Sequence, residues 1–331
     1  MTQTAIGNRP VRMAKAGTMN TTSPGRPGAR RRRRVLLPAG FLQTLEGLTS
    51  HRQGDLGYWG SRGACASDAD MAMLRNNVKV SGDGPRTMMF SHGFGCDQNM
   101  WTEVARSFER DFRVVLFDHV GAGRSDLGAY DRGKYSSLDG YADDVVEIGH
   151  ALDLRDAIFV GHSVSAMIGA LASMKAPGMF RELIMVGPSP RYVDDGDYVG
   201  GFSHAQVEEL LDFLADNHLG WSAAMAPAIM GNAERPELGA ALANSFCATD
   251  PEIAREFARV TFFSDNRADL PRIAARTLVL QCRDDIIAPQ CVGEYVHSHI
   301  ANSEYVLLDA TGHCPNLSAP QEVAAAIRAF L

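Results

Sequence analysis

A serine at the apex of a strand–turn–helix segment is the first candidate for chemistry in this chain. Ser163 lies in Gly161-His162-Ser163-Val164-Ser165, after the apolar run Ile158–Val160 and before a small-residue stretch with helical spacing. Such a turn exposes the hydroxyl at a helix N-terminus, where free N–H groups favour developing negative charge. The fifth position of this five-residue motif is usually Gly, but Ser165 is small enough for the helix to pack closely against the strand. We interpret the segment as a nucleophile elbow; a serine that only caps a helix is the alternative.

A serine hydroxyl becomes a useful nucleophile only beside a base, and the base needs an orienting acid. In this kind of hydrolase the chain order is Ser, acid, His. Asp284 and Asp285 both follow the strand-like run Thr277–Cys282, and we favour Asp285 because the residues after it lead into a helix. His313 lies in a Gly-containing loop after the last strand-like run. The sequence therefore predicts a catalytic triad of Ser163, Asp285 and His313.

A glycine-containing loop upstream supplies a candidate oxyanion hole. Met88–Phe90 reads as a strand, and His92-Gly93-Phe94-Gly95 follows it. Glycines let backbone N–H groups approach a substrate closely, so we expect the amides of Phe94 and Val164 to face the oxyanion. The loop Asp118–Gly123 also follows a strand, but it lacks the third glycine and the downstream acid of a dinucleotide-binding fingerprint. No cofactor is expected.

Composition and charge exclude several classes of function. The 331 residues carry a net charge of −7, which divides into +7 for residues 1–70 and −14 for the remainder. An acidic body argues against a nucleic-acid partner. The six cysteines show no paired spacing, so we expect free thiols in a cytoplasmic protein, with no metal site. No run of 18 apolar residues occurs, so no membrane span is expected.

Residues 1–72 differ in composition from the rest, with five consecutive arginines at 30–34 and many Gly, Pro, Ser and Thr residues. Such a segment cannot bury a core, and we expect a disordered basic extension. It could mimic a secretion signal, although its apolar run is short, or form a basic tail that touches nucleic acid or anionic lipid. A wrongly assigned start is the third interpretation, with the true start at Met71 or Met73.

The elements that position these residues alternate between strand and helix patterns over 73–187 and 268–331. This alternation is typical of an α/β fold with a mostly parallel sheet covered on both faces. Residues 188–267 show only helix patterns, which predicts a helical cap inserted over the catalytic end of the sheet. The helices expected there are Ala205–Asn217, Trp221–Met230, Pro236–Ser245 and Pro251–Phe263.

These motifs together resemble one branch of the α/β-hydrolase superfamily, which contains the bacterial stress-response regulator RsbQ and the plant karrikin and strigolactone receptors. The resemblance runs from about residue 74 to the end. It is carried by His92–Gln98 with Trp101, Leu116–Asp118, Gly121–Asp126, Tyr135, Leu138–Ala142, Gly161–Gly169, Val186–Arg191, Asp284–Pro289 and Gly312–Pro315. The Asp284–Pro289 and Gly312–Pro315 stretches are most similar to the bacterial member, and Ser165 is similar to the plant receptors.

The resemblance implies the α/β-hydrolase fold, the same triad, and slow hydrolysis of small esters or lactone-like ligands in a closed apolar pocket. It favours Phe94, Trp221 and Phe263 as pocket walls, and we place His162 there too. A serine hydrolase acting through an acyl-enzyme is our first hypothesis. The alternative is an RsbQ-like sensor that binds such a ligand and signals to a partner protein, for example a stress-pathway phosphatase.

Overall fold

The computed structural model describes residues 67–331, and the expected extension up to residue 66 lies outside them. The described part opens with helix α1 (Asp68–Arg75), whose Ser67 and Asp70 cap each other's backbone N–H groups at 3.1 Å. Arg75 binds Asp144 at 2.9 Å. The boundary expected at residue 72 therefore falls inside a helix tied to the core. A start at Met71 or Met73 would remove its cap, and the start position stays a prediction.

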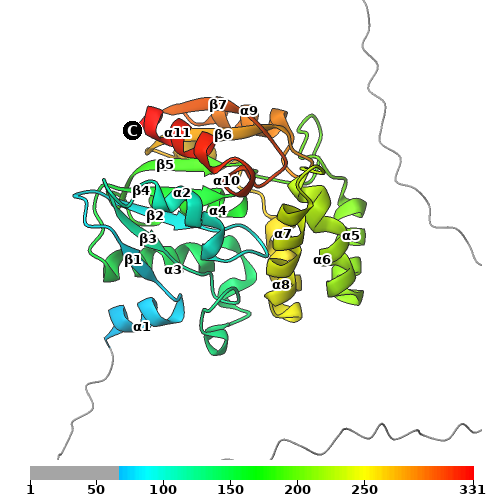
Figure 1. Cartoon of the computed structure of the whole chain (residues 1–331), viewed down its shortest axis with the longest axis horizontal. Coiled ribbons are helices and arrows are strands. Elements are labelled where there is room, and N and C mark those ends of the chain that lie inside the picture. Colours follow the sequence, from blue (N-terminus) through cyan, green and yellow to red (C-terminus); the bar gives the residue numbers. More distant parts are fainter. Residues whose placement is uncertain (1–66) are drawn as a thin grey trace, which may run out of the picture. The chain divides into compact units, whose positions relative to one another are not determined.

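A seven-stranded sheet forms the centre of the described residues (Figure 1). Its order is β1-β3-β2-β4-β5-β6-β7; β1 is antiparallel to β3, and every other neighbouring pair is parallel. The predicted α/β-hydrolase fold is confirmed. The strands are β1 (Lys79–Ser81), β2 (Thr87–Ser91), β3 (Arg113–Leu116), β4 (Ala157–His162), β5 (Phe180–Val186), β6 (Arg276–Asp284) and β7 (Ser303–Thr311).

The central strands are buried on both faces, and alternate residues enter two apolar layers. Phe90 and Val160 pack with helices α2 and α11, whereas Met89 and Phe159 pack with α3, α4 and α9. Helices on both faces are what parallel strands with crossover connections require. These helices are α2 (Thr102–Arg106), α3 (Leu138–Ala151), α4 (Val164–Lys175), α9 (Gln290–His299) and α11 (Pro320–Phe330).

Shorter helical turns connect these elements. The helix expected over 98–108 is divided into a 3-10 turn, Gln98–Trp101, and the short α2. The remaining short elements are the 3-10 turns Leu127–Ala129, Lys134–Ser136 and Leu270–Arg272 and helix α10 (Pro315–Ser318).

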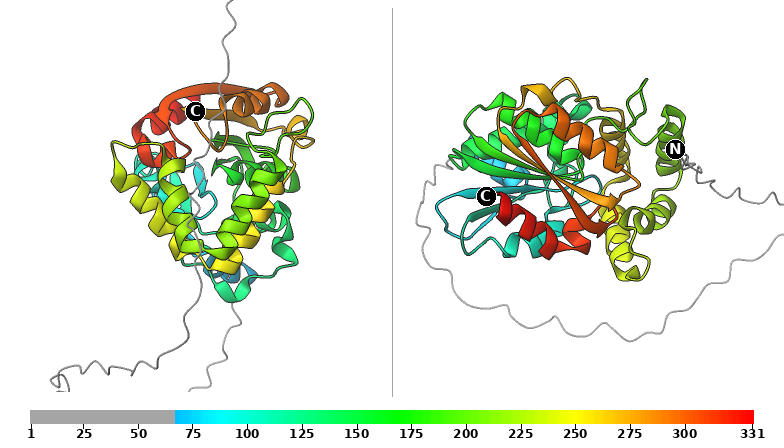
Figure 2. Two further views of the ribbon diagram at one scale, coloured as in Figure 1. Left: turned by 90° about the vertical axis from the view of Figure 1, so that its right-hand side faces the viewer. Right: turned by 90° about the horizontal axis from the view of Figure 1, so that it is seen from above.

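Four helices lie between β5 and β6 and form the cap. They are α5 (His204–Asp216), α6 (His218–Met230), α7 (Pro236–Ala248) and α8 (Pro251–Phe263). Each begins where the sequence signals a helix start: Ser203, Asn217 and Asp250 cap backbone N–H groups, and α7 begins with a proline. The four helices lie together at one end of the sheet, as two views show (Figures 1 and 2). The expected cap limits, 188 and 267, stay a prediction.

None of the helices in residues 67–331 combines the length and the apolar character that a membrane crossing would need.

Candidate active site

The turn at Ser163 has the strained backbone of a nucleophile elbow. Ser163 has φ 57° and ψ −124°, a conformation that costs a non-glycine residue about 1–3 kcal/mol. The strain is held by the fully buried strand β4 on one side, by helix α4 on the other, and by the Ser163 N–H, which donates to Val186 O at 2.8 Å. Gly161 is needed because a Cβ there would collide with the carbonyl of Ser165.

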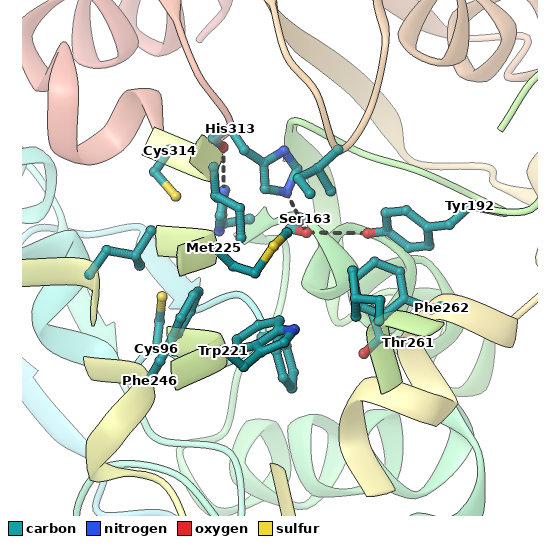
Figure 3. Close-up of a pocket in the computed structure, with 16 residues that line it drawn as sticks. Cys96, Ser163, Tyr192, Trp221, Met225, Phe246, Thr261, Phe262, His313 and Cys314 are labelled. Carbon is teal, nitrogen blue, oxygen red and sulfur yellow. Dashed lines mark hydrogen bonds between the residues drawn. The ribbon is translucent and has the colours of Figure 1, made fainter. Parts of the chain in front are cut away.

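Ser163, His313 and Asp285, far apart in the sequence, meet in one series of hydrogen bonds. His313 Nε2 lies 2.7 Å from Ser163 Oγ (Figure 3). On the other side of the ring, His313 Nδ1 lies 2.7 Å from Asp285 Oδ2. All three side chains are buried, whereas Asp284, the competing candidate, is exposed. The three residues come from the carboxyl ends of β4, β6 and β7, which meet at one edge of a parallel sheet.

The electrostatics of Asp285 suit an orienting acid. Burial alone would raise the pKa of this carboxyl, but neighbouring His313 and the backbone N–H groups of Ile287 and Ala288 outweigh burial and hold the pKa below its usual value. The group is therefore a carboxylate at neutral pH. It accepts the proton on His313 Nδ1 and leaves Nε2 free to accept the proton of Ser163.

The loop that carries His313 is tied to both the elbow and the cap. His162 Nε2 donates to the carbonyl of His313 at 2.7 Å, and burial beside His313 lowers the pKa of His162 to about 3, so this ring is neutral. The His313 N–H donates to the carbonyl of Ile229 at 2.9 Å, near the end of cap helix α6. Asn232 adds a second link by donating to Thr311 O at 3.0 Å.

The predicted oxyanion loop follows β2 and lies against the elbow. Gly93 has no room for a side chain, because a Cβ would collide with His162 Nδ1. Outside the bonds internal to helices and strands, no backbone hydrogen bond of residues 67–331 is donated by the N–H of Phe94 or of Val164. Val164 is the first residue of α4, where an N–H has no acceptor within the helix. Two free N–H groups beside a nucleophile are what an oxyanion hole requires. Their role stays a prediction.

An apolar cavity opens on Ser163 beneath the cap. The space at the pocket, including its opening to solvent, is about 490 Å³, and the centre of a water molecule can reach only about 30 Å³. Trp221 and Phe246 lie across the cavity from Ser163 and His313 (Figure 3). The remaining walls come from loop, elbow and cap residues: Phe94, Cys96, His162, Tyr192, Leu210, Met225, Ile229, Leu242, Thr261, Phe262, Ile287 and Cys314.

Three of the four residues predicted for the pocket line it, namely Phe94, His162 and Trp221. The fourth, Phe263, is a correction, because its neighbour Phe262 lines the cavity instead. Phe263 packs outside, with its ring 4.9 Å from that of His204. Adjacent residues of a helix point about 100° apart, and the rotation of α8 turns Thr261 and Phe262 toward the cavity and Phe263 away from it.

Tyr192 is a site residue that the sequence did not reveal. Its hydroxyl lies 3.2 Å from Ser163 Oγ, and burial raises the pKa of Tyr192, so the phenol stays protonated (Figure 3). Because Ser163 gives its own proton to His313, Tyr192 donates to Ser163 Oγ. The only available signal was position: Tyr192 follows β5 and so comes from the same sheet edge as the triad.

The described part of this site contains neither a cluster of metal-ligating side chains nor a reactive thiol. Within residues 67–331, no group of three or more His, Cys, Asp or Glu side chains is placed to hold a metal ion. Cys96 and Cys314 line the cavity, and burial raises the pKa of both thiols, to about 12 for Cys96. A protonated thiol is a weak nucleophile, so chemistry in this cavity falls to Ser163.

The elbow, the hydrogen-bonded serine, histidine and aspartate, and the cap over a parallel sheet define the class of α/β-fold serine hydrolases. Residues 88–326 match the alpha/beta hydrolase family, and the chain belongs to this family.

The sequence relatives of this chain include plant esterases and receptors. The chain is 37% identical over 256 residues to the strigolactone esterase D14 of Arabidopsis thaliana, covering 77% of this chain and 96% of the relative. It is 36% identical over 253 residues to the karrikin insensitive 2 receptor CA of Petunia hybrida, covering 75% of this chain and 92% of the receptor. A solved hydrolase from Oleispira antarctica superposes with a TM-score of 0.78 at 40% identity, covering 80% of this chain and 98% of that one.

Proposed function

We propose that this chain hydrolyses a small apolar ester or lactone through an acyl-enzyme on Ser163. The observation that carries the proposal is the unbroken series of 2.7 Å hydrogen bonds from Ser163 through His313 to Asp285, beside an apolar cavity that opens on Ser163. Nucleophile, base and orienting acid are in direct contact, so these three side chains are already aligned for proton transfer.

In the proposed reaction, Ser163 Oγ attacks the carbonyl carbon of the ligand while its proton passes to His313 Nε2. The carbonyl oxygen becomes an oxyanion that accepts the N–H groups of Phe94 and Val164. The intermediate collapses, and the leaving oxygen takes the proton from His313. Water then gives a proton to His313 and attacks the acyl carbon. The second intermediate collapses, His313 returns this proton to Ser163 Oγ, and the acid is released. With a lactone, the leaving hydroxyl stays attached to the acyl group.

The size and polarity of the cavity set the substrate class. Its walls are mostly aromatic and aliphatic. The ring of Phe94 has four aromatic neighbours with centroids within 6.4 Å of its own: Trp221, Phe246, Phe257 and Phe262. A charged acyl group would lose its hydration here without a partner. The relatives named for strigolactone and karrikin support a compact lactone-like ligand.

A sensor is the second candidate, and the tie between His313 and cap helix α6 favours it, because a ligand at the triad then acts on the cap surface. The receptor names among the relatives point the same way. We propose an RsbQ-like role, in which the cap contacts a regulatory protein such as a stress-pathway phosphatase. The described cysteines are all free, which supports a cytoplasmic location.

Hydrolysis of p-nitrophenyl acetate by the full chain tests the proposal. We expect release of p-nitrophenol and a 42-Da acetyl adduct on Ser163, both lost in Ser163→Ala. Ser173→Ala is the matched control, since this serine lies on the same helix and bonds only to Ala170 O. Steady turnover favours the enzyme, and a stoichiometric burst followed by very slow turnover favours the sensor. Absence of both Ser163-dependent release of p-nitrophenol and a Ser163 adduct would refute both.

A further inference from the structure

A second polar cluster lies buried directly behind the nucleophile elbow. It joins Ser91 at the end of β2, His119 in the loop after β3, and Ser165 in the first turn of α4, and all three are completely buried. Ser165 Oγ lies 2.9 Å from Ser91 Oγ and 2.8 Å from His119 Nε2. It donates its own proton to the carbonyl of His92 at 2.5 Å. None of these side chains takes part in the proposed reaction.

The positions of the protons in this cluster follow from its geometry. Ser165 has one proton and gives it to His92 O, so Ser165 Oγ must accept from both Ser91 and His119. His119 therefore carries its ring proton on Nε2. Its Nδ1 has no hydrogen-bond partner, and the rings of Phe117, Tyr141 and Phe257 pack against the His119 ring. Burial lowers the pKa of His119 well below its usual value, which keeps the ring neutral.

The cluster holds the peptide groups that lead to the Phe94 amide. The His119 N–H donates to His92 Nε2 at 3.0 Å, so the proton of the His92 ring is on Nδ1 and is donated to Gly93 O at 2.9 Å. Gly93 C=O and Phe94 N–H belong to one planar peptide, so fixing the carbonyl fixes the direction of the N–H. Ser165 holds the preceding carbonyl, and it directly follows Val164, whose N–H is the other candidate oxyanion donor.

We propose that Ser165 and His119 are positioning residues that lock the two halves of the oxyanion hole to each other. The hydroxyl of Ser165 links helix α4, which supplies the Val164 N–H, to the loop that supplies the Phe94 N–H. A glycine at position 165 has no hydroxyl to make this link. The serine that replaces the usual glycine of the elbow motif is therefore a functional element of this chain. The inference rests on the proposed function and adds the residues that align its transition-state donors.

Two variants test the link without touching the triad. Ser165→Ala removes the hydroxyl, and His119→Phe removes the ring N–H while the backbone N–H to His92 remains. We expect the rate constant of the acetylation burst with p-nitrophenyl acetate to fall about tenfold to a hundredfold, less than the hundredfold to thousandfold loss of an oxyanion donor. The inhibition constant of phenylboronic acid, which forms a tetrahedral anion on Ser163, should rise by the same factor. The dissociation constant of the noncovalent substrate complex, obtained from the substrate dependence of the burst rate, should change little.

Controls separate this role from a structural one. His119→Gln keeps an N–H near the position of Nε2 and should recover part of the rate, and Ser173→Ala should behave as the wild type. A loss of thermal stability in Ser165→Ala without any change in acetylation rate or boronate affinity would overturn the inference. In that case Ser163 of the wild type still reacts, so the proposed function survives.

A second measurement tests the link even if the wild type does not react with the ester, or if the Ser165→Ala chain folds poorly. In ¹⁵N-labelled protein, the Phe94 amide should shift and exchange its hydrogen faster in His119→Phe, and in Ser165→Ala where it folds, but not in Ser173→Ala. An unchanged Phe94 amide in His119→Phe would refute the link whether or not the chain hydrolyses an ester.

Discussion

Replacing Asp285 by Asn changes one oxygen of a buried carboxylate into an NH₂ group and leaves its shape intact. Oδ1 accepts N–H groups from Ile287 and Ala288 at 2.8 and 3.0 Å, so the amide must keep its oxygen at that position. The NH₂ group then faces His313 Nδ1 across the 2.7 Å contact. An amide N–H only donates, so Nδ1 must accept and the ring proton moves to Nε2. Nε2 then has no lone pair for the proton of Ser163.

The size of this effect follows from the loss of the base. We expect kcat to fall about ten-thousandfold, as when a triad histidine is held in the wrong tautomer, which corresponds to about 5.5 kcal/mol of barrier. The two backbone bonds to the side-chain oxygen remain, so the fold should persist. Asp284→Asn is the matched control, because that neighbour is exposed and contacts no triad atom; its kcat should equal that of the wild type.

Burst and steady-state release of p-nitrophenol measure both variants, with circular dichroism to compare folding. A folded Asp285→Asn chain within tenfold of the wild type would refute the tautomer reasoning. A large loss of kcat in Asp284→Asn instead would show that Asp284, not Asp285, is the acid of the triad.

Three further predictions concern the pocket, the nucleophile and pH. Phe262→Ala should raise KM for p-nitrophenyl acetate and lower the free energy of unfolding by about 3–5 kcal/mol, whereas Phe263→Ala should leave KM unchanged; the reverse order would contradict the wall assignment. Tyr192→Phe should keep kcat within about tenfold, because a long bond between neutral hydroxyls contributes about 0.5–1.5 kcal/mol; a thousandfold loss would give the phenol a catalytic role. The histidines whose pKa burial lowers are His92, His119 and His162. These rings stay neutral in the folded state but protonate below pH 6.5 in the unfolded state. The free energy of unfolding should therefore be constant above pH 6.5 and fall below it, by up to about 1.4 kcal/mol per histidine and pH unit. Urea unfolding from pH 8 to 5 measures this free energy, and a flat profile would contradict the prediction.

Much of the fold could be predicted because its signals are local. The cap helices α7 and α8 begin at the residues expected for them, since prolines and capping side chains mark their starts. The predicted order of Ser163, Asp285 and His313 matches the order in which the sheet brings them together, because each follows a strand end and parallel strands end at one edge.

What the sequence did not reveal depends on contacts between distant segments. Whether Phe262 or Phe263 faces the cavity depends on the rotation of α8 about its axis, which the packing of the cap decides. Tyr192 lies in an irregular stretch with no periodicity to indicate its direction. The role inferred for His119 requires β2, β3 and α4 to be neighbours, and no local pattern places its ring beside Ser165.

The hydrogen bond from the His313 N–H to the carbonyl of Ile229 joins cap helix α6 directly to the residue that acts as the base. We expect a ligand that displaces helix α6 to pull on the loop that carries His313 as well. Such a ligand would disturb the alignment of His313 with Ser163, so the cap would influence which molecules react as well as which molecules enter.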